Sequence, residues 1–323
     1  MHKVYDHWPE IAKESYNTTL TQIDFNTITH VVFAGMGGSG ALHDIFSAIL
    51  SKTNIHVSVI KGYNLPNTID SETLVVTTSV SGNTVETLTV LDLAKKTNCK
   101  MIAFSSGGKM KDYCFDNKVE HRNVPIYHSP RSSFPSFLFS MLKVLEPVIP
   151  IKREDVVESI NSLENLKRKI SSDNLVSDNP SIDIANWITN IPVIYYPWGL
   201  QAAAIRFKNS LQENAKRHAM IEDVIEVCHN GMVAWSRDSY VKPILIRGHD
   251  DYIKTKERWN IIKEFFEQNK IEYKEIFSVR GSILAKLINL IYLLDYSTIY
   301  LSVISGVDPT PVTAIDFIKS KTY

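Results

Sequence analysis

The chain has 323 residues, 44% of them hydrophobic and 22% charged, which is typical of a soluble globular protein large enough for two domains. Its 35 basic and 35 acidic residues balance, so overall charge does not favour nucleic acid or an anionic membrane as a partner. The sequence shows neither a run of about 18 apolar residues nor an N-terminal signal segment, and Cys99, Cys114 and Cys228 form no disulfide or metal spacing, which predicts a cytoplasmic location.

The first half of the chain alternates short apolar runs with helical patterns. Residues 1–29 predict one or two short helices, and a helix follows the first strand at 41–50. Strands are predicted at 30–34, 55–60, 74–77, 100–104 and 125–127. Strands that alternate with helices of this length predict an α/β fold with a mainly parallel sheet flanked by helices.

The second half repeats this plan after a helical connection at 136–190. Strands are predicted at 191–196, 243–247 and 273–279, and helices at 199–216, 252–268 and 282–294. A terminal helix follows the Asp-Pro-Thr-Pro segment at 308–311 and carries Lys319. We therefore predict two consecutive domains of similar plan, residues 1–150 and residues 151–323.

A glycine-rich turn follows the first predicted strand. Gly35, Gly37 and Gly40 match the G-x-G-x-x-G dinucleotide fingerprint. That site also needs an acidic residue about 20 positions later, and residues 59–63 contain none, so we expect no nucleotide cofactor. The glycines still allow a ligand to approach the backbone closely at Gly38 and Ser39. The alternative is a tight turn that only permits close helix packing.

A turn rich in hydroxyl groups follows the third predicted strand. Its phosphate-binding candidates are Ser79, Ser81, Thr84 and Thr87, and the turn contains no lysine or arginine. A strand, a polar turn and a helix present backbone N–H groups and the positive end of a helix dipole to an anion. We predict a sugar phosphate held by neutral donors, at the carboxyl ends of strands where the winding reverses. The alternative is that this turn only caps a helix, with Asn83 and Glu86 as a capping box.

Together the two turns resemble the SIS domain, a sugar-phosphate-binding fold. Three further segments resemble the bifunctional phosphoglucose/phosphomannose isomerases, over nearly the whole chain and in the correct order: Pro-Arg-Ser-Ser-Phe-Pro at 130–135, Gln-Glu-Asn-Ala-Lys at 212–216 and Cys-His-Asn at 228–230. The chain departs from that family's pattern at Gly40, Gln212 and Gly231. Gly231 stands where the family has an acidic residue after His-Asn, which puts the positioning of the histidine in doubt.

The resemblance implies a role for each matched residue. Glu213 is the base that moves a proton between C2 and C1, and Arg131 is the fixed charge beside the developing enediolate. His229 assists opening of the sugar ring, and the family supplies it from the neighbouring subunit of a dimer. Lys319 resembles the active-site lysine, although Lys321 competes for that assignment. Without the resemblance, a surface arginine, an exposed glutamate and solvated lysines are the ordinary interpretations.

We therefore expect an aldose–ketose isomerase that interconverts glucose 6-phosphate, and mannose 6-phosphate as well, with fructose 6-phosphate through a cis-enediol. No metal-ligand spacing appears in the sequence, and we expect no metal ion. One alternative is a sugar-phosphate sensor without catalysis, although residues 1–29 are short and poor in basic residues for a DNA-binding helix pair. Another is an isomerase of a different sugar phosphate.

Overall fold

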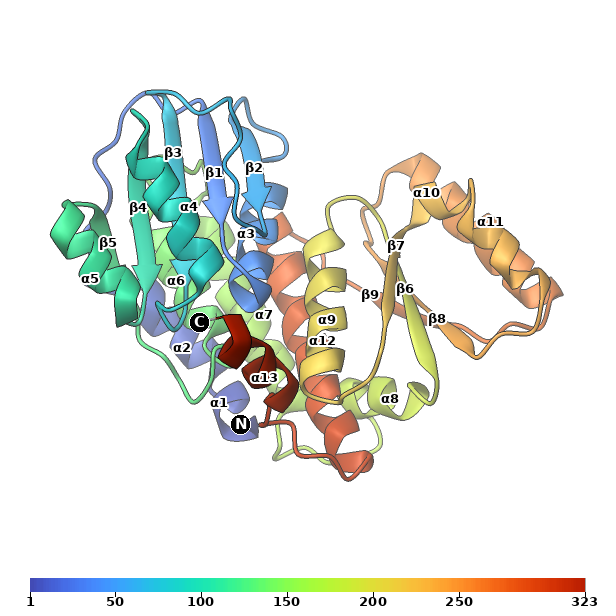
Figure 1. Ribbon diagram of the computed structural model, residues 1–323. Helices are drawn as coiled ribbons and strands as arrows, with labels where there is room; N and C mark the ends of the chain where they lie inside the picture. Colours follow the sequence, from blue (N-terminus) through green and yellow to red (C-terminus); the bar gives the residue numbers. More distant parts are fainter. Residues whose placement is uncertain (323) are drawn as a thin grey trace.

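The computed structural model describes residues 1–322 and contains two parallel sheets, each flanked by helices (Figure 1). The first sheet has the order β2-β1-β3-β4-β5, and every strand pair in it is parallel. All positions of β1 and β3 are buried, as expected for central strands covered on both faces. The strands are β1 (His30–Ala34), β2 (His56–Ile60), β3 (Thr73–Ser79), β4 (Lys100–Ser105) and β5 (Glu120–Asn123).

The second sheet has the order β7-β6-β8-β9 and is also parallel throughout. Its first strand in the chain again lies between the second and the third, so both sheets begin with the same winding. The predicted parallel α/β architecture is confirmed. The strands are β6 (Ile191–Tyr196), β7 (Met220–Asp223), β8 (Val241–Arg247) and β9 (Lys274–Phe277).

Helices precede, separate and follow these strands. Helix α12, in orange in Figure 1, runs between the two sheets and packs against α7, α8 and α9. The helices are α1 (His2–Asp6), α2 (Trp8–Tyr16), α3 (Gly37–Leu50), α4 (Val85–Lys95), α5 (Gly108–Asn117), α6 (Phe134–Val144), α7 (Arg153–Ile170), α8 (Pro180–Trp187), α9 (Gln201–Glu213), α10 (Val224–Val227), α11 (Ile253–Gln268), α12 (Ile283–Ile304) and α13 (Thr313–Thr322), with a 3₁₀ helix, η1, at Gly231–Ser236.

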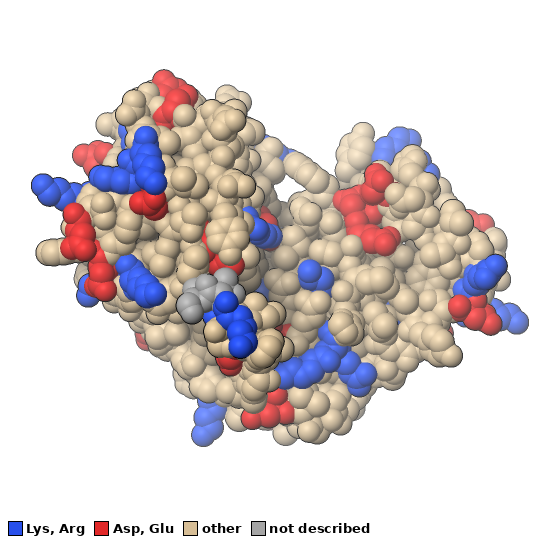
Figure 2. Space-filling view, viewed as in Figure 1, with Lys and Arg blue, Asp and Glu red and all other residues tan. Residues whose placement is uncertain are grey.

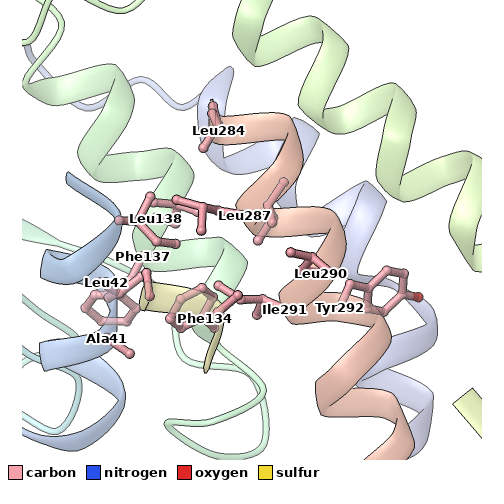
Figure 3. Packing of buried hydrophobic residues seen from close by; sticks show 14 of the residues in the cluster. Ala41, Leu42, Phe134, Phe137, Leu138, Leu284, Leu287, Leu290, Ile291 and Tyr292 are labelled. Atoms are coloured by element: carbon pink, nitrogen blue, oxygen red, sulfur yellow. The ribbon is translucent and has the colours of Figure 1, made fainter. Parts of the chain in front are cut away.

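One core connects the two halves of the chain. In Figure 3 the side chains of Leu287 and Ile291 on α12 face Leu42 of α3 and Phe137 of α6. Helix α12 is long and apolar enough to cross a membrane, but 83% of its most apolar window is buried inside the protein, as in a core helix. The prediction ended this helix at residue 294, ten residues before its observed end at Ile304.

Two strand predictions differ from the structure. The strand predicted at 125–127 is wrong, because β5 lies earlier and the later residues form the turn into α6. In that turn the carbonyl of Pro125 accepts from the Ser136 hydroxyl, and the Tyr127 carbonyl accepts from the Ser132 hydroxyl. Strand β7 was not predicted, because a four-residue edge strand with the sequence Met-Ile-Glu-Asp lacks the apolar run of a central strand.

Candidate active site

The glycine turn and the hydroxyl turn lie side by side at the carboxyl edge of the first sheet. Strands β1 and β3 are hydrogen-bonded neighbours, and Ala34 at the end of β1 lies opposite Thr77 near the end of β3. The chain turns from β1 to β2 on one side and continues to β3 on the other, so the winding reverses between them. The predicted position of both turns is therefore confirmed.

The glycine turn is itself the start of helix α3. Helix α3 begins at Gly37, four residues earlier than predicted, and its N-cap residue Met36 provides no side-chain cap. Gly37 has a φ of +53°, and a Cβ built there meets no atom within 4 Å, so the space above it is open. The helix start thus leaves backbone N–H groups available near Gly38. The Ser39 side chain is largely buried.

The hydroxyl turn also leads to a helix without a side-chain cap. Ser79 Oγ lies 2.9 Å from Thr84 Oγ1, and Ser81 Oγ accepts a hydrogen bond from the Asn83 N–H. Thr84 is the N-cap of α4 and makes no capping bond, whereas Asn83 Oδ1 accepts from the N–H of Lys109. The capping box considered as the alternative is therefore not formed.

Two further features shape this turn. Gly82 has a φ of +71°, and a Cβ there would come within 1.8 Å of the Gly107 carbonyl oxygen, so the close contact between the two loops requires glycine. Thr87 is buried in the first turn of α4, and its hydroxyl has no hydrogen-bond partner among residues 1–322.

A buried, neutral histidine links helix α3, which begins at the glycine turn, to the end of strand β3, where the hydroxyl turn begins. His43 of α3 is fully buried, and its Nε2 lies 3.0 Å from Thr78 Oγ1 at the end of β3. Burial, with a smaller contribution from the Lys61 ammonium, lowers the pKa of His43 to about 3. His43 therefore stays uncharged at neutral pH and links α3 to β3.

The predicted base and the predicted fixed charge are paired. Arg131 Nε lies 3.2 Å from Glu213 Oε2, with 7% of the arginine side chain and 25% of the glutamate side chain exposed. Arg131 Nη1 also donates to the backbone carbonyl of Glu213 at 3.1 Å and to Asn214 Oδ1 at 2.7 Å. Because Glu213 is the last residue of α9, its partly exposed carboxylate lies at the end of a rigid helix beside a permanent cation.

The segment before the terminal helix is attached to the same pair. Arg131 donates from Nη1 to the Pro309 carbonyl and from Nη2 to the Thr310 carbonyl, each at 2.9 Å. Lys216 Nζ donates to the Pro311 carbonyl at 2.9 Å and to the Glu213 carbonyl at 2.6 Å. Burial and the neighbouring Arg131 lower the pKa of Lys216.

The two lysines considered for the active site both lie on α13. The Lys319 side chain is exposed and makes no hydrogen bond or ion pair within residues 1–322. Lys321 is also exposed, and its Nζ lies 6.0 Å from the centre of the Phe317 ring. These surroundings do not distinguish between the two lysines, so the assignment of Lys319 as the active-site lysine stays a prediction.

His229 lies away from this constellation within one chain. It is exposed just after α10, which Figure 1 shows beyond the second sheet, on the side away from α13. Its expected delivery from a neighbouring subunit stays a prediction. The departure at Gly231 has a local reason, because a Cβ there would come within 2.6 Å of Glu222 Oε2 and within 2.4 Å of Val227 Cγ2.

The structure adds site residues that the prediction missed. Asn214 and Lys216 belong to the segment that carries Glu213, so their position in the sequence was an available signal. Arg206 was also missed, and its Nη1 lies 3.3 Å from where a Cβ of Gly38 would be. The expectation of neutral phosphate donors stays a prediction. Arg206, Ser210 and Asn214 share one face of α9 at a spacing of four residues, which is visible in the sequence.

Charge elsewhere on this face follows no single pattern. Figure 2 shows lysine and arginine side chains interspersed with aspartate and glutamate over the view of Figure 1. Within residues 1–322, no group of three or more His, Cys, Asp or Glu side chains is arranged to hold a metal ion.

Comparisons with known proteins agree with this geometry. Residues 177–322 match the family described as the bacterial phospho-glucose isomerase C-terminal SIS domain. The chain is 32% identical to a bifunctional phosphoglucose/phosphomannose isomerase of Caldicellulosiruptor bescii, covering 97% of this chain and 96% of the relative. It is 31% identical to a protein of the same name from Thermoplasma acidophilum, covering 98% of both.

Similarity to solved structures extends the agreement to the fold. The C-terminal domain of glucosamine-fructose-6-phosphate aminotransferase from Francisella tularensis superimposes with a TM-score of 0.70 at 14% identity. The alignment covers 95% of this chain and 96% of that one. At this identity the likeness supports the fold alone.

Proposed function

The chain belongs to the family of bifunctional phosphoglucose/phosphomannose isomerases, and from that premise we propose which of its residues perform the reaction. The activity is the interconversion of glucose 6-phosphate and mannose 6-phosphate with fructose 6-phosphate. The two aldoses differ only at C2, and both give the same cis-enediol when the C2 proton is removed. We propose that this step proceeds without a metal ion.

The Arg131–Glu213 pair is the observation that carries the mechanism. The Glu213 carboxylate removes the proton from C2, and the C–H electrons form the C1=C2 bond while negative charge develops on O1. The Arg131 guanidinium, 3.2 Å from the carboxylate, stabilises that charge. The proton of the C2 hydroxyl passes to O1, and Glu213 returns its proton to C1 as the C2 oxygen becomes a carbonyl. Lys319 supplies a further cation at this end of the substrate.

Phosphate binding is assigned to the two turns at the edge of the first sheet. The donors are the hydroxyl groups and the helix starts of α3 and α4, whose caps are not taken by side chains. The phosphate-binding residues are Gly38, Ser39, Ser79, Ser81, Thr84 and Thr87. Because these groups are uncharged, they bind a substrate that must also leave.

The proposed assembly is a homodimer, as the family resemblance implies. We assign ring opening to His229 of a neighbouring subunit in a homodimer, since this exposed residue lies beyond the second sheet within its own chain. The matching winding of the two sheets supports two consecutive SIS-type domains, residues 1–150 and 151–323. The three free cysteines are consistent with a cytoplasmic enzyme.

A coupled assay tests the assignment. Purified protein should convert glucose 6-phosphate and mannose 6-phosphate to fructose 6-phosphate with EDTA present, and loss of activity with EDTA would reject the metal-free step. Glu213→Gln should lower kcat by roughly 10²–10⁴-fold, because it removes the general base. Gln212→Ala, a change at the exposed neighbouring position, is the matched control and should retain activity. A fully active Glu213→Gln enzyme would exclude Glu213 as the base.

A further inference from the structure

One buried side chain, Arg206 of α9, lies beside the glycine turn and donates a hydrogen bond to the loop that carries Arg131. We propose that Arg206, held by Asp295, is a positioning residue that sets the place of Arg131 and therefore of the Glu213 carboxylate. This inference rests on the proposed function, because it assigns a role in the step performed by that pair.

The Arg206 guanidinium is fixed by a buried carboxylate on α12. The two side chains are 2% and 0% exposed, and Nη2 of Arg206 lies 2.6 Å from Asp295 Oδ2. Arg206 Nε donates to both carboxylate oxygens, at 3.2 and 3.0 Å. The carboxylate also accepts from the hydroxyls of Ser210, at 2.6 Å, and Tyr5, at 3.3 Å. A planar guanidinium held by several bonds to one carboxylate has little freedom to rotate.

From this fixed position, Arg206 holds the Arg131 loop. Its Nη2 donates to the backbone carbonyl of Arg131 at 2.9 Å, and its guanidinium carbon lies 4.5 Å from the centre of the Phe134 ring. Trp8 Nε1 donates to the next carbonyl, that of Ser132, also at 2.9 Å. Two buried donors therefore set the path of the backbone at the residue whose side chain pairs with Glu213.

The same guanidinium supports the glycine turn. Arg206 Nη1 would lie 3.3 Å from a Cβ at Gly38, and it makes no hydrogen bond within residues 1–322. It therefore lies close to Gly38 in the first turn of α3. The distance between the phosphate-binding turn and the Arg131–Glu213 pair depends on one rigid group, and a group displaced by about 1 Å from its productive geometry can cost 10²-fold in rate.

A purely structural ion pair would behave differently from a positioning residue. A structural role lowers the amount of folded enzyme, but it leaves kcat per folded molecule and the isotope sensitivity of the reaction unchanged. A positioning role slows the proton transfer itself. With glucose 6-phosphate deuterated at C2, the kinetic isotope effect on kcat then increases, because proton transfer limits turnover more completely.

The experiment compares Arg206→Lys with a control pair in the second sheet. A lysine ammonium ends one bond short of the Nη2 position, from which Arg206 binds both Asp295 and the Arg131 carbonyl, and it lacks the Nε donor. We therefore expect kcat to fall by about 10²-fold while KM changes by less than about threefold and the isotope effect rises. Glu275→Gln, which removes the partner of Arg247, should leave kcat and the isotope effect unchanged. Thermal unfolding and concentration of folded protein are measured for each variant.

A milder variant keeps the test valid if Arg206→Lys does not fold. Ser210→Ala removes one hydrogen bond to Asp295 but preserves both charges, and it should lower kcat by about fivefold with a raised isotope effect. Unchanged kcat and isotope effect in whichever of these variants folds would overturn the inference. An active Glu213→Gln enzyme would instead reject the proposed function, so the two failures are distinguishable.

Discussion

The two sheets wind alike but differ at the edge where ligands bind in such folds. In the first, β1 and β3 lead to turns of glycine and hydroxyl residues that contain no carboxylate. In the second, β8 leads to Gly-His-Asp-Asp at 248–251. There Asp251 Oδ2 accepts from the Gly248 N–H and from Trp259 Nε1, each at 3.1 Å.

This difference shows that topology provides the backbone N–H groups at the sheet edge, whereas the turn side chains determine whether a phosphate can bind there. A reversal of winding exposes backbone N–H groups at the edge of either sheet. In the second sheet the chain's own carboxylate occupies one of these groups, and a carboxylate there repels a phosphate. In the first sheet the turns at 35–40 and 77–84 contain no carboxylate. Function therefore depends on the turn residues and not on the winding alone.

The largest effect should come from giving the first sheet the acidic character of the second. Ser81→Asp places a carboxylate in the hydroxyl turn, and Asp can still accept the Asn83 N–H that Ser81 Oγ accepts. Two unit charges 4 Å apart repel by about 4 kcal/mol near a protein surface, so KM for hexose 6-phosphates should rise by about 10³-fold. Ser81→Asn is the neutral control. A normal KM for Ser81→Asp would place the phosphate elsewhere.

A smaller effect should be a loss of unfolding free energy at low pH, caused by the buried His43 of the first sheet. The pKa of His43 is about 3 in the folded protein, below its ordinary value of 6.5, so the neutral form is favoured by folding. Its contribution to stability is complete above pH 6.5 and is lost as pH falls towards 3. Between pH 7 and pH 4.5 the wild type should lose about 2–3 kcal/mol of unfolding free energy relative to His43→Gln.

Urea titrations at the two pH values measure this difference. A constant difference between wild type and His43→Gln would show that His43 is protonated at pH 4.5 in the folded state. The histidine after β8, His249, is exposed and stacks on Phe277 with ring centres 5.1 Å apart, so His249→Gln is the matched control from the second sheet.

The smallest effect should come from Asp251→Asn, which removes a carboxylate from the turn after β8 and should change only the pH dependence of stability. Burial raises the pKa of Asp251 above 3.8, although the Gly248 and Trp259 hydrogen bonds oppose that rise. Folding therefore favours the protonated carboxyl, and this contribution is lost as pH rises through the raised pKa. Relative to Asp251→Asn, the wild type should gain stability as pH falls from 7 to 3, as measured by urea unfolding. KM should not change, and a changed KM would connect this turn to substrate binding.

Much of the fold could be predicted, because its central strands are apolar runs without a break. Strands β1 and β6 begin and end at the predicted residues, since a strand buried on both faces has a continuous hydrophobic sequence. Strand β7 and the true position of β5 could not be predicted in the same way. Both are short and polar, and pairing with a neighbouring strand determines them more than their own residues do.

The site residues also divide into those that local sequence predicts and those that only the tertiary structure shows. The two turns follow predicted strands, and their neighbourhood follows from the parallel winding, so local sequence was sufficient for them. Resemblance to a family supplied Arg131 and Glu213, and the structure brings these two together across 82 positions of sequence. No local pattern indicates that Arg206 pairs with Asp295, 89 residues later, or that it lies against Gly38.

The sequence by itself determined the α/β class, the central strands and the two turns, because each is encoded by residues adjacent in the chain. Only the tertiary structure decided how α9 packs against α12, and this packing sets the buried charge between the glycine turn and the Arg131 loop. The physical reason is that a buried ion pair needs its two helices in register, and many distant contacts set that register together.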